Sequence, residues 1–256
     1  EGFSDCAWEV TRGAKVVFIT TPDDLIESIC MSISGHRGFE ENAVAIHCSG
    51  ALSSEILSSA RECGAMVASL HPLQSFASAD QAVSLVPGSF CTIEGDRDAL
   101  LIVRQIVEDL GGIVLEIAAE KKTLYHAGAV AASNYLVTLI HLALKLNEAA
   151  GLAGDTSLNA LLPLIRGTLA NISAKGIPCA LTGPVARGDV ATVSGHVKAI
   201  EKDAPELLPL YSCLGLCTVD LAKAKGTLTK VAAEKLVALL GPQRPGPDKP
   251  EPNGSP

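Results

Sequence analysis

Short apolar runs alternate with helical patterns through the first part of the chain, and this alternation constrains the fold more than any other feature. The runs are rich in β-branched residues and are predicted as buried strands. The helical patterns between them cover residues 23–33, 52–63 and 98–110, the last with Asp96 as its predicted N-cap. This order is typical of an α/β sheet with helices on both faces. The predicted strands are 14–20, 43–48, 65–70, 90–93 and 113–117.

After about residue 118 the strand signal ends and only helical patterns follow. A long stretch over 121–150 precedes further helices over 157–174, from Asp189 to 202, from Pro205 to 225, and from Thr229 to Gly241. The final residues are rich in proline and are predicted to lack fixed structure. We therefore expect a partial α/β domain over 1–118, an all-helical domain over 119–241 and a disordered tail over 242–256.

The charge and the cysteines narrow the class of partner. The net charge is −8, with 20 basic and 28 acidic residues, so neither a nucleic-acid partner nor an anionic membrane is expected. The eight cysteines form no Cys-x-x-Cys motif and no Cys/His cluster at zinc spacing. We therefore expect no metal site. We expect the thiols to be reduced and mostly buried, which indicates a reducing compartment and a cytoplasmic protein. A small molecule is the expected ligand.

One stretch admits a membrane interpretation. Residues 123–144 contain no Asp, Glu, Lys or Arg and are long enough to cross a bilayer. The same stretch carries two histidines and an asparagine, and its first half is rich in Ala and Gly. We favour a buried central helix of a protein without membrane contact.

Compact polar segments follow the first three predicted strands. Each segment on its own is explained by ordinary turn chemistry, in which Pro and Gly end strands and Ser or Asp caps the next helix. In open α/β sheets, however, ligands bind at the carboxyl ends of strands. Three such segments at successive strand ends favour a shared ligand crevice. The residues concerned are Thr20, Thr21 and Pro22, then His47, Ser49 and Gly50, then His71 and Pro72.

The long helical stretch carries a second polar group. At 100° per residue, Lys122, His126 and Ser133 fall within about 40° of one face, and Asn134 lies about 80° from His126. Lys122, His126 and Asn134 could bind a carbonyl or carboxylate and supply a proton. A surface lysine with hydrogen-bonded core groups explains the spacing equally well, and spacing alone does not separate the two.

A glycine- and proline-containing loop over 181–189 forms the third candidate. Thr182 and Gly183 precede a predicted helix start, whose free N–H groups favour an anion, and Arg187 could clamp a carboxylate or phosphate. His196, two turns further on, could face the same crevice or simply pack. The alternative is a plain connector between helices, in which Asp189 is the N-cap. The motifs G-x-G-x-x-G, G-x-x-x-x-G-K-[ST], G-x-S-x-G and H-E-x-x-H are all missing from the sequence.

Seven segments in a fixed order carry a family resemblance that spans residues 5 to 240. Together they resemble the Rossmann-like oxidoreductases that have an uncharacterised helical C-terminal domain, relatives of pyrroline-5-carboxylate reductase and of the 6-phosphogluconate and 3-hydroxyacid dehydrogenases. The segments are TTPDD (20–24), HCSGAL (47–52), SLHPLQSFA (69–77), PGSFCTIEGD (87–96), KKTLYHAGAVAASNYLV (121–137), LLPLIRGTLANI (161–172) and LTGPVARGDVATVSGH (181–196).

The resemblance implies hydride transfer with NADP or NAD, in a cleft between an N-terminal cofactor domain and a helical domain that commonly dimerises, so we expect a homodimer. The resemblance does not imply a substrate, and the predicted anion site at Arg187 leads us to expect a small anionic metabolite. The resemblance also implies that the strand-end residues contact the cofactor, and that His47 and His71 lie near its nicotinamide ring. By the resemblance, five residues face the substrate: Lys122, His126, Asn134, Thr182 and Arg187. Gly183 and His196 join them as candidates from the loop over 181–189 and the helix that follows it.

Two departures from that family modify the expectation. The hydroxyacid dehydrogenases have Asn four residues after the catalytic Lys, where this chain has His126, which weakens an expectation of hydroxyacid chemistry. The family also begins with a strand and a Gly-rich turn, and this chain begins at a point that matches the helix before the fourth strand. We therefore expect weak or absent dinucleotide binding by these residues and an exposed sheet edge. The alternative function is a non-catalytic dimeric scaffold or ligand sensor derived from the same fold.

Overall fold

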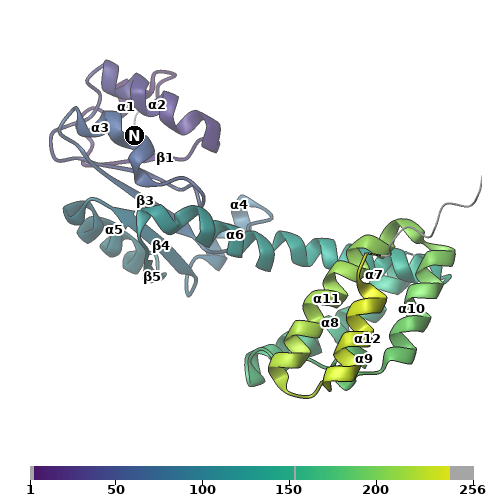
Figure 1. Ribbon diagram of the computed structural model, residues 1–256. Coiled ribbons are helices and arrows are strands. Elements are labelled where there is room, and N and C mark those ends of the chain that lie inside the picture. Colours follow the sequence, from purple (N-terminus) through teal and green to yellow (C-terminus); the bar gives the residue numbers. More distant parts are fainter. Residues whose placement is uncertain (1–2, 153, 243–256) are drawn as a thin grey trace, which may run out of the picture. The chain divides into compact units, whose positions relative to one another are not determined.

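The computed structural model describes residues 3–152 and 154–242, which form two compact units (Figure 1). The N-terminal unit is Glu1–Leu136 and the C-terminal unit is Val137–Pro256. The disordered tail predicted over 242–256 lies, beyond its first residue, outside the described residues. Each unit is described by itself below.

A five-stranded sheet forms the centre of the N-terminal unit, in the order β1-β2-β3-β4-β5. The strands are β1 (Val16–Ile19), β2 (Val44–His47), β3 (Met66–Pro72), β4 (Phe90–Gly95) and β5 (Ile113–Glu116). β1, β2 and β3 pair in parallel, β4 runs antiparallel to β3, and β5 is again parallel to β4. The five predicted strands are all present, whereas the reversal at β4 has no counterpart in the prediction.

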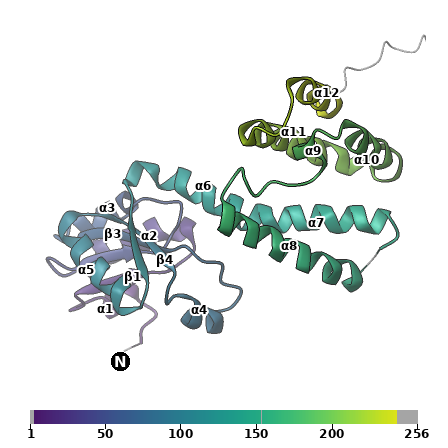
Figure 2. The same cartoon turned by 90° about the horizontal axis from the view of Figure 1, so that it is seen from below.

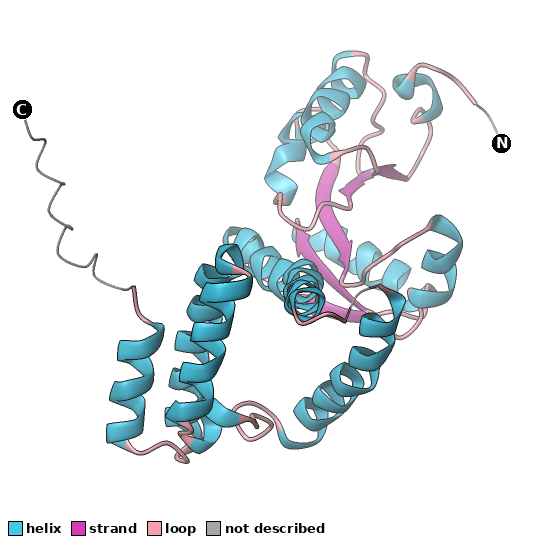
Figure 3. Ribbon diagram, turned by 90° about the vertical axis from the view of Figure 1, so that its right-hand side faces the viewer, coloured by secondary structure: helices cyan, strands magenta, loops and turns pink. Residues whose placement is uncertain are grey.

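Helices cover both faces of this sheet (Figure 3). One face packs against α2 (Asp23–Gly35), η1 (Ser54–Leu57) and α3 (Ser58–Arg61), through a core that includes Ile26 and Leu57. The other face packs against α5 (Arg97–Asp109), through a core that includes Val103 and Ile93. Both cores are apolar because each helix places its hydrophobic residues at a helical period toward the sheet. The short helices α1 (Ala7–Val10), α4 (Ala79–Leu85) and η2 (Ala119–Lys121), followed by α6 (Lys122–Ala132), complete the unit.

The C-terminal unit contains helices only among its described residues. The first are α7 (Asn134–Ala149), which begins just before the unit boundary, and α8 (Asp155–Lys175) (Figure 2). The side-chain amide of Asn147 in α7 donates a 2.9 Å hydrogen bond to Ser157 Oγ in α8. The others share an apolar core that includes Val193, Val219 and Leu236. These are α9 (Pro184–Arg187), α10 (Val190–Asp203), η3 (Pro205–Leu207), α11 (Leu208–Lys225) and α12 (Lys230–Leu240).

The expectation of one long buried helix over 121–150 was wrong in two respects. The helix is interrupted at Ser133, which has φ −110° and ψ −72°, so Ser133 does not continue the face that carries Lys122 and His126. The stretch is also mostly exposed, since only 6% of its most apolar window is buried within the chain. By length and composition, two helical stretches of the described residues, Ala119–Ala149 and Pro205–Lys225, could cross a membrane.

Two smaller expectations also need correction. The thiols are all free, but only Cys30 and Cys91 are buried, while Cys179, Cys213 and Cys217 are exposed. Asp96 does stand at the N-cap position of α5, yet its side chain makes no capping hydrogen bond. Its carboxylate instead accepts hydrogen bonds from the Arg61 guanidinium, a charge-assisted donor, and from the backbone N–H of Val67.

Candidate active site

The carboxyl ends of the three parallel strands bring the predicted cofactor residues to one edge of the sheet. Thr20, Thr21 and Pro22 follow β1, while Ser49 and Gly50 follow β2. His47 ends β2, and His71 and Pro72 end β3. These residues gather because parallel strands end at the same edge. Thr21 Oγ1 is buried at this edge without a hydrogen-bond partner among the described residues.

His47 is fully buried, and one of its ring nitrogens has no hydrogen-bond partner within the described part of the chain. The backbone N–H of Ser49 donates to His47 Nδ1 at 3.1 Å, and Ser49 Oγ donates to Asp23 at 2.7 Å. Burial, reinforced by the positive charge of Lys122, lowers the pKa of His47 to about 4. The imidazole is therefore neutral at pH 7, and because Nδ1 accepts, its proton lies on Nε2. Nε2 is buried without a partner among the described residues, so it is a donor available to a ligand.

His71 and His126 converge on Gly50 from two different elements. Their ring centroids lie 5.7 Å apart at an interplanar angle of 80°. A side chain at position 50 would place its Cβ 2.4 Å from His126 Nδ1 and 2.7 Å from His71 Nε2, which only glycine avoids. Burial and the neighbouring His126 lower the pKa of His71 to about 4. The phenol of Tyr125 lies 3.3 Å from His71 Nδ1 and helps to orient this ring.

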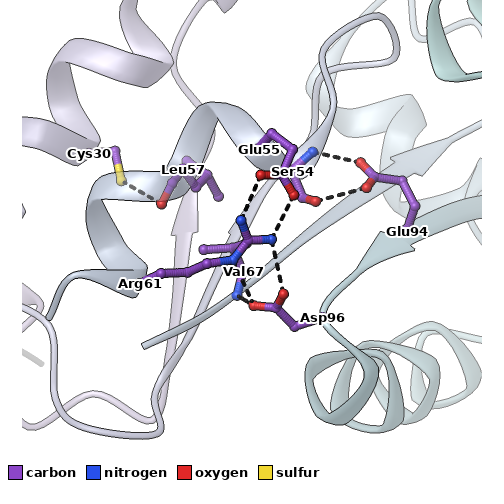
Figure 4. A network of polar contacts seen from close by, with 8 residues as sticks. All are labelled: Cys30, Ser54, Glu55, Leu57, Arg61, Val67, Glu94 and Asp96. Atoms are coloured by element: carbon purple, nitrogen blue, oxygen red, sulfur yellow. Dashed lines mark hydrogen bonds and ion pairs between the residues drawn. The ribbon is translucent and has the colours of Figure 1, made fainter. Parts of the chain in front are cut away.

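Lys122, at the start of α6, is buried beside these histidines and is 1% exposed. Its ammonium donates a hydrogen bond to Ser69 Oγ and lies 3.6 Å from Glu94 Oε1. Glu94 in turn accepts hydrogen bonds from the backbone N–H of Ser54 at 2.7 Å and from Ser54 Oγ at 2.8 Å (Figure 4). Burial lowers the pKa of Lys122 to about 8, with the Glu94 charge acting in the opposite direction.

The register of the sheet explains why these polar groups meet. His47 lies opposite Ser69, and Ser69 lies opposite Glu94. Residues in register across neighbouring strands point to the same face. A polar row, His47–Ser69–Glu94, therefore crosses three strands on one face, and Lys122 reaches it from α6.

The predicted residues of the C-terminal unit are mainly exposed. Thr182, Arg187 and His196 lie at the surface of that unit, and His196 Nδ1 is 2.8 Å from the Tyr211 hydroxyl. Gly183, with φ +95°, precedes α9, which is only four residues long. Asp189 is the N-cap of α10, as predicted, and accepts from Thr192 N–H at 3.0 Å. That these residues join the strand-end site, together with exposed Asn134, stays a prediction.

Several members of the site carry only a weak sequence signal or none. Ser54, Ser69, Glu94 and Tyr125 were not singled out, although Glu94 is a charged residue directly after an apolar run. That signal is weak, because a charge after such a run usually marks the exposed end of a strand. Only the antiparallel pairing of β4 with β3 brings Glu94 inside.

A family model and solved structures match this chain. The model described as a domain of unknown function, DUF2520, matches residues 89–218. Protein TM1727 from Thermotoga maritima is 31% identical and has a TM-score of 0.69, with 84% of this chain and 81% of that chain covered. No curated protein matches the sequence.

Two further structures are more distant in sequence. A candidate NADP oxidoreductase from Bacteroides fragilis, BF3122, is 21% identical with a TM-score of 0.64, covering 81% of this chain and 76% of that one. The pyrroline carboxylate reductase of Plasmodium falciparum, with NADP bound, is 16% identical with a TM-score of 0.53, covering 93% and 82%. At these identities the likeness shows a shared fold, a Rossmann-like N-terminal half followed by a helical C-terminal domain, as predicted.

Proposed function

The chain belongs to the DUF2520 family and has the fold of NAD(P)-dependent oxidoreductases, and on this premise we propose that it transfers hydride between a nicotinamide cofactor and a small anionic metabolite. The observation that carries the proposal is the strand-end edge, where His47 Nε2 and Thr21 Oγ1 are buried without partners among the described residues. Buried polar groups in proteins are nearly always hydrogen-bonded, so such atoms support a ligand at this edge.

The residues present fit the nicotinamide end of such a cofactor. The neutral His47 would donate from Nε2 to a carboxamide oxygen, and Gly50 leaves room for close approach between the His71 and His126 rings. Thr20, Thr21 and Pro22 would line the same edge. The sequence offers no G-x-G-x-x-G turn for the pyrophosphate, so we expect weak binding of the dinucleotide to these 256 residues. When bound, the cofactor supplies or accepts the hydride.

The chain's own groups would provide the proton and the charge. Lys122 or His126 would give a proton to the oxygen or nitrogen that receives negative charge. The buried Lys122 ammonium would also stabilise that charge, since electrostatic stabilisation is strong in a site shielded from water. Arg187 and the 182–184 backbone would orient an anionic group of the substrate.

The test is a nicotinamide assay with matched variants. NADPH oxidation is followed with a panel of small keto acids and cyclic imines, with wild-type protein and with Lys122→Met, His126→Gln and Arg187→Met. Loss of turnover by at least about 100-fold in one of the first two identifies the proton donor. A wild-type protein that shows neither turnover nor NADPH binding at millimolar cofactor would refute the proposal.

We also infer self-association through the helices, because the apolar stretch Ala119–Ala149 is only 6% buried in its most apolar window. Large exposed apolar surfaces are typically covered by a partner. A homodimer in a reducing, cytoplasmic compartment is compatible with an enzyme and equally with a non-catalytic scaffold or ligand sensor. Detectable turnover in the NADPH assay distinguishes the enzyme from the other two. Sedimentation at tens of micromolar protein tests the dimer, and a monomer at that concentration would contradict it.

A further inference from the structure

A small polar pocket lies beside β4, and the residues that line it are not those of the strand-end site. It has a volume of about 260 Å³, and its lining includes Ser54, Glu94 and Asp96. Because β4 runs antiparallel to β3, the carboxyl end of β4 lies beside the first half of β3: Gly95 is opposite Ala68, and Asp96 N–H donates to Val67. Glu94 itself stands level with Ser69 and with the strand-end residue His47, so the pocket begins at this row and continues past Gly95 and Asp96.

Glu94 stands between this pocket and the buried lysine. Its side chain is 3% exposed, so it borders the pocket while remaining almost wholly inside the protein. One carboxylate oxygen lies 3.6 Å from Lys122 Nζ, and both oxygens are held by Ser54. On the pocket side, Arg61 bonds to Glu55 and Asp96 and fixes the rim (Figure 4).

We propose that Glu94 connects Lys122 to this pocket, so that Lys122 exchanges its proton with solvent through the pocket and not through the strand-end site. On release, the N–H bond of Lys122 breaks and an O–H bond forms on the Glu94 carboxylate. Glu94 then gives that proton to water in the pocket. Uptake is the reverse, and no electrons move in either direction.

The surroundings of Lys122 support this route. Besides Glu94 of β4, the groups that act on its charge are His47 of β2, Cys48 directly after it, His71 of β3 and Asp23 of α2. His47 and His71 have pKa values lowered to about 4 and are poor proton acceptors at pH 7. Burial raises the pKa of Cys48, so its thiol stays protonated. Glu94 is thus the adjacent buried carboxylate, and it is the group that reaches a pocket.

This route rests on the proposed function and extends it. When cofactor and substrate fill the strand-end site, a Lys122 that has given up its proton has no contact with water on that side. The route does not require turnover to be tested. The exchange of Lys122 Nζ protons with solvent can be followed in the intact chain by nitrogen-15 NMR of labelled lysines, with the exposed neighbour Lys121 as internal reference.

Three variants separate the routes. Glu94→Gln and Ala119→Trp, the latter filling the pocket, should each slow Lys122 exchange at least about tenfold relative to Lys121. Glu116→Gln removes another carboxylate from the pocket lining, one that pairs with Arg104, and should leave the exchange rate unchanged.

Ala119→Trp keeps the test decisive if Glu94→Gln does not fold, because it leaves the buried pair intact. An unchanged Lys122 exchange rate in folded Ala119→Trp protein would overturn the proposal. Slowed exchange in a protein that never oxidises NADPH would support the path while the proposed activity fails, so the two failures are distinguishable.

Discussion

The two units of the chain treat polar side chains in opposite ways. In the N-terminal unit, His47, Ser69, Glu94 and Lys122 are all buried beside one another. In the described part of the C-terminal unit, the buried residues are almost all apolar, and Arg187 and His196 lie at the surface. Burying polar and charged groups costs free energy unless they are paired. The N-terminal unit, which carries this cost, is therefore the better candidate for chemistry. Four predictions test that contrast.

The largest effect is expected from Lys122→Met. The variant leaves the Glu94 carboxylate buried without its cation, which should lower the free energy of unfolding by about 3–5 kcal/mol. The double variant Lys122→Met/Glu94→Gln should recover most of that loss. Arg187→Met in the other unit should change stability by less than about 0.5 kcal/mol. Urea unfolding measures all three, and equal losses for Lys122→Met and Arg187→Met would remove the contrast.

Acid should destabilise the N-terminal unit next most strongly. The pKa of His47 is about 4 in the folded chain against an ordinary 6.5, so between these values the unfolded chain binds more protons. Stability therefore falls as pH drops from 6.5 toward 4, by about 3 kcal/mol in total for this residue. His71 acts in the same direction.

Hydrogen exchange across pH 6.5 to 4 locates this loss. Amides of β2 and β3 should lose protection before those of α12, and His47→Gln should flatten the dependence. A pH profile that His47→Gln leaves unaltered would show that the imidazole is not held neutral.

A smaller effect is expected from Gly50→Ala. The new Cβ would lie 2.4 Å from His126 Nδ1, so one or both imidazoles must move, at a cost of about 1–3 kcal/mol. Ring signals of His71 and His126 in NMR spectra should shift, while those of His196 stay in place. Gly128→Ala, a glycine within α6 with open space around it, is the matched control and should not destabilise the protein.

The smallest effect concerns the helix caps of the C-terminal unit. Asp189→Ala removes the cap of α10 and Thr229→Ala that of α12, and each should cost about 1 kcal/mol without altering the histidines of the other unit. Thermal unfolding of the two variants checks this. A loss as large as that of Lys122→Met would mean that the surface of this unit carries more than local structure.

The elements of the fold were largely predictable, and their pairing was not. Apolar runs and caps located each strand and the major helices to within a few residues, because hydrophobic period and capping are local properties. A parallel and an antiparallel strand have the same apolar pattern, so residues 90–95 do not predict that β4 runs antiparallel to β3.

The candidate site was predictable to a similar extent. The strand-end histidines followed from their position after apolar runs, whereas Glu94 required knowledge of which residues of β4 lie opposite which residues of β3. Lys122 was singled out as a group facing substrate, but its neighbours, Ser69 and Glu94, are 53 and 28 positions away in sequence and no local pattern links them.

The reversed strand also sets where the chain can tolerate changes in length. A slip of one residue between β3 and β4 would carry Glu94 through the sheet to the layer beneath α5 and bring Ile93 under the lysine. Insertions and deletions should therefore be excluded from 90–95 yet accepted in the connector over 73–89. Related sequences that vary in size should do so in that connector, and the spacing from β4 to its own polar row should be constant.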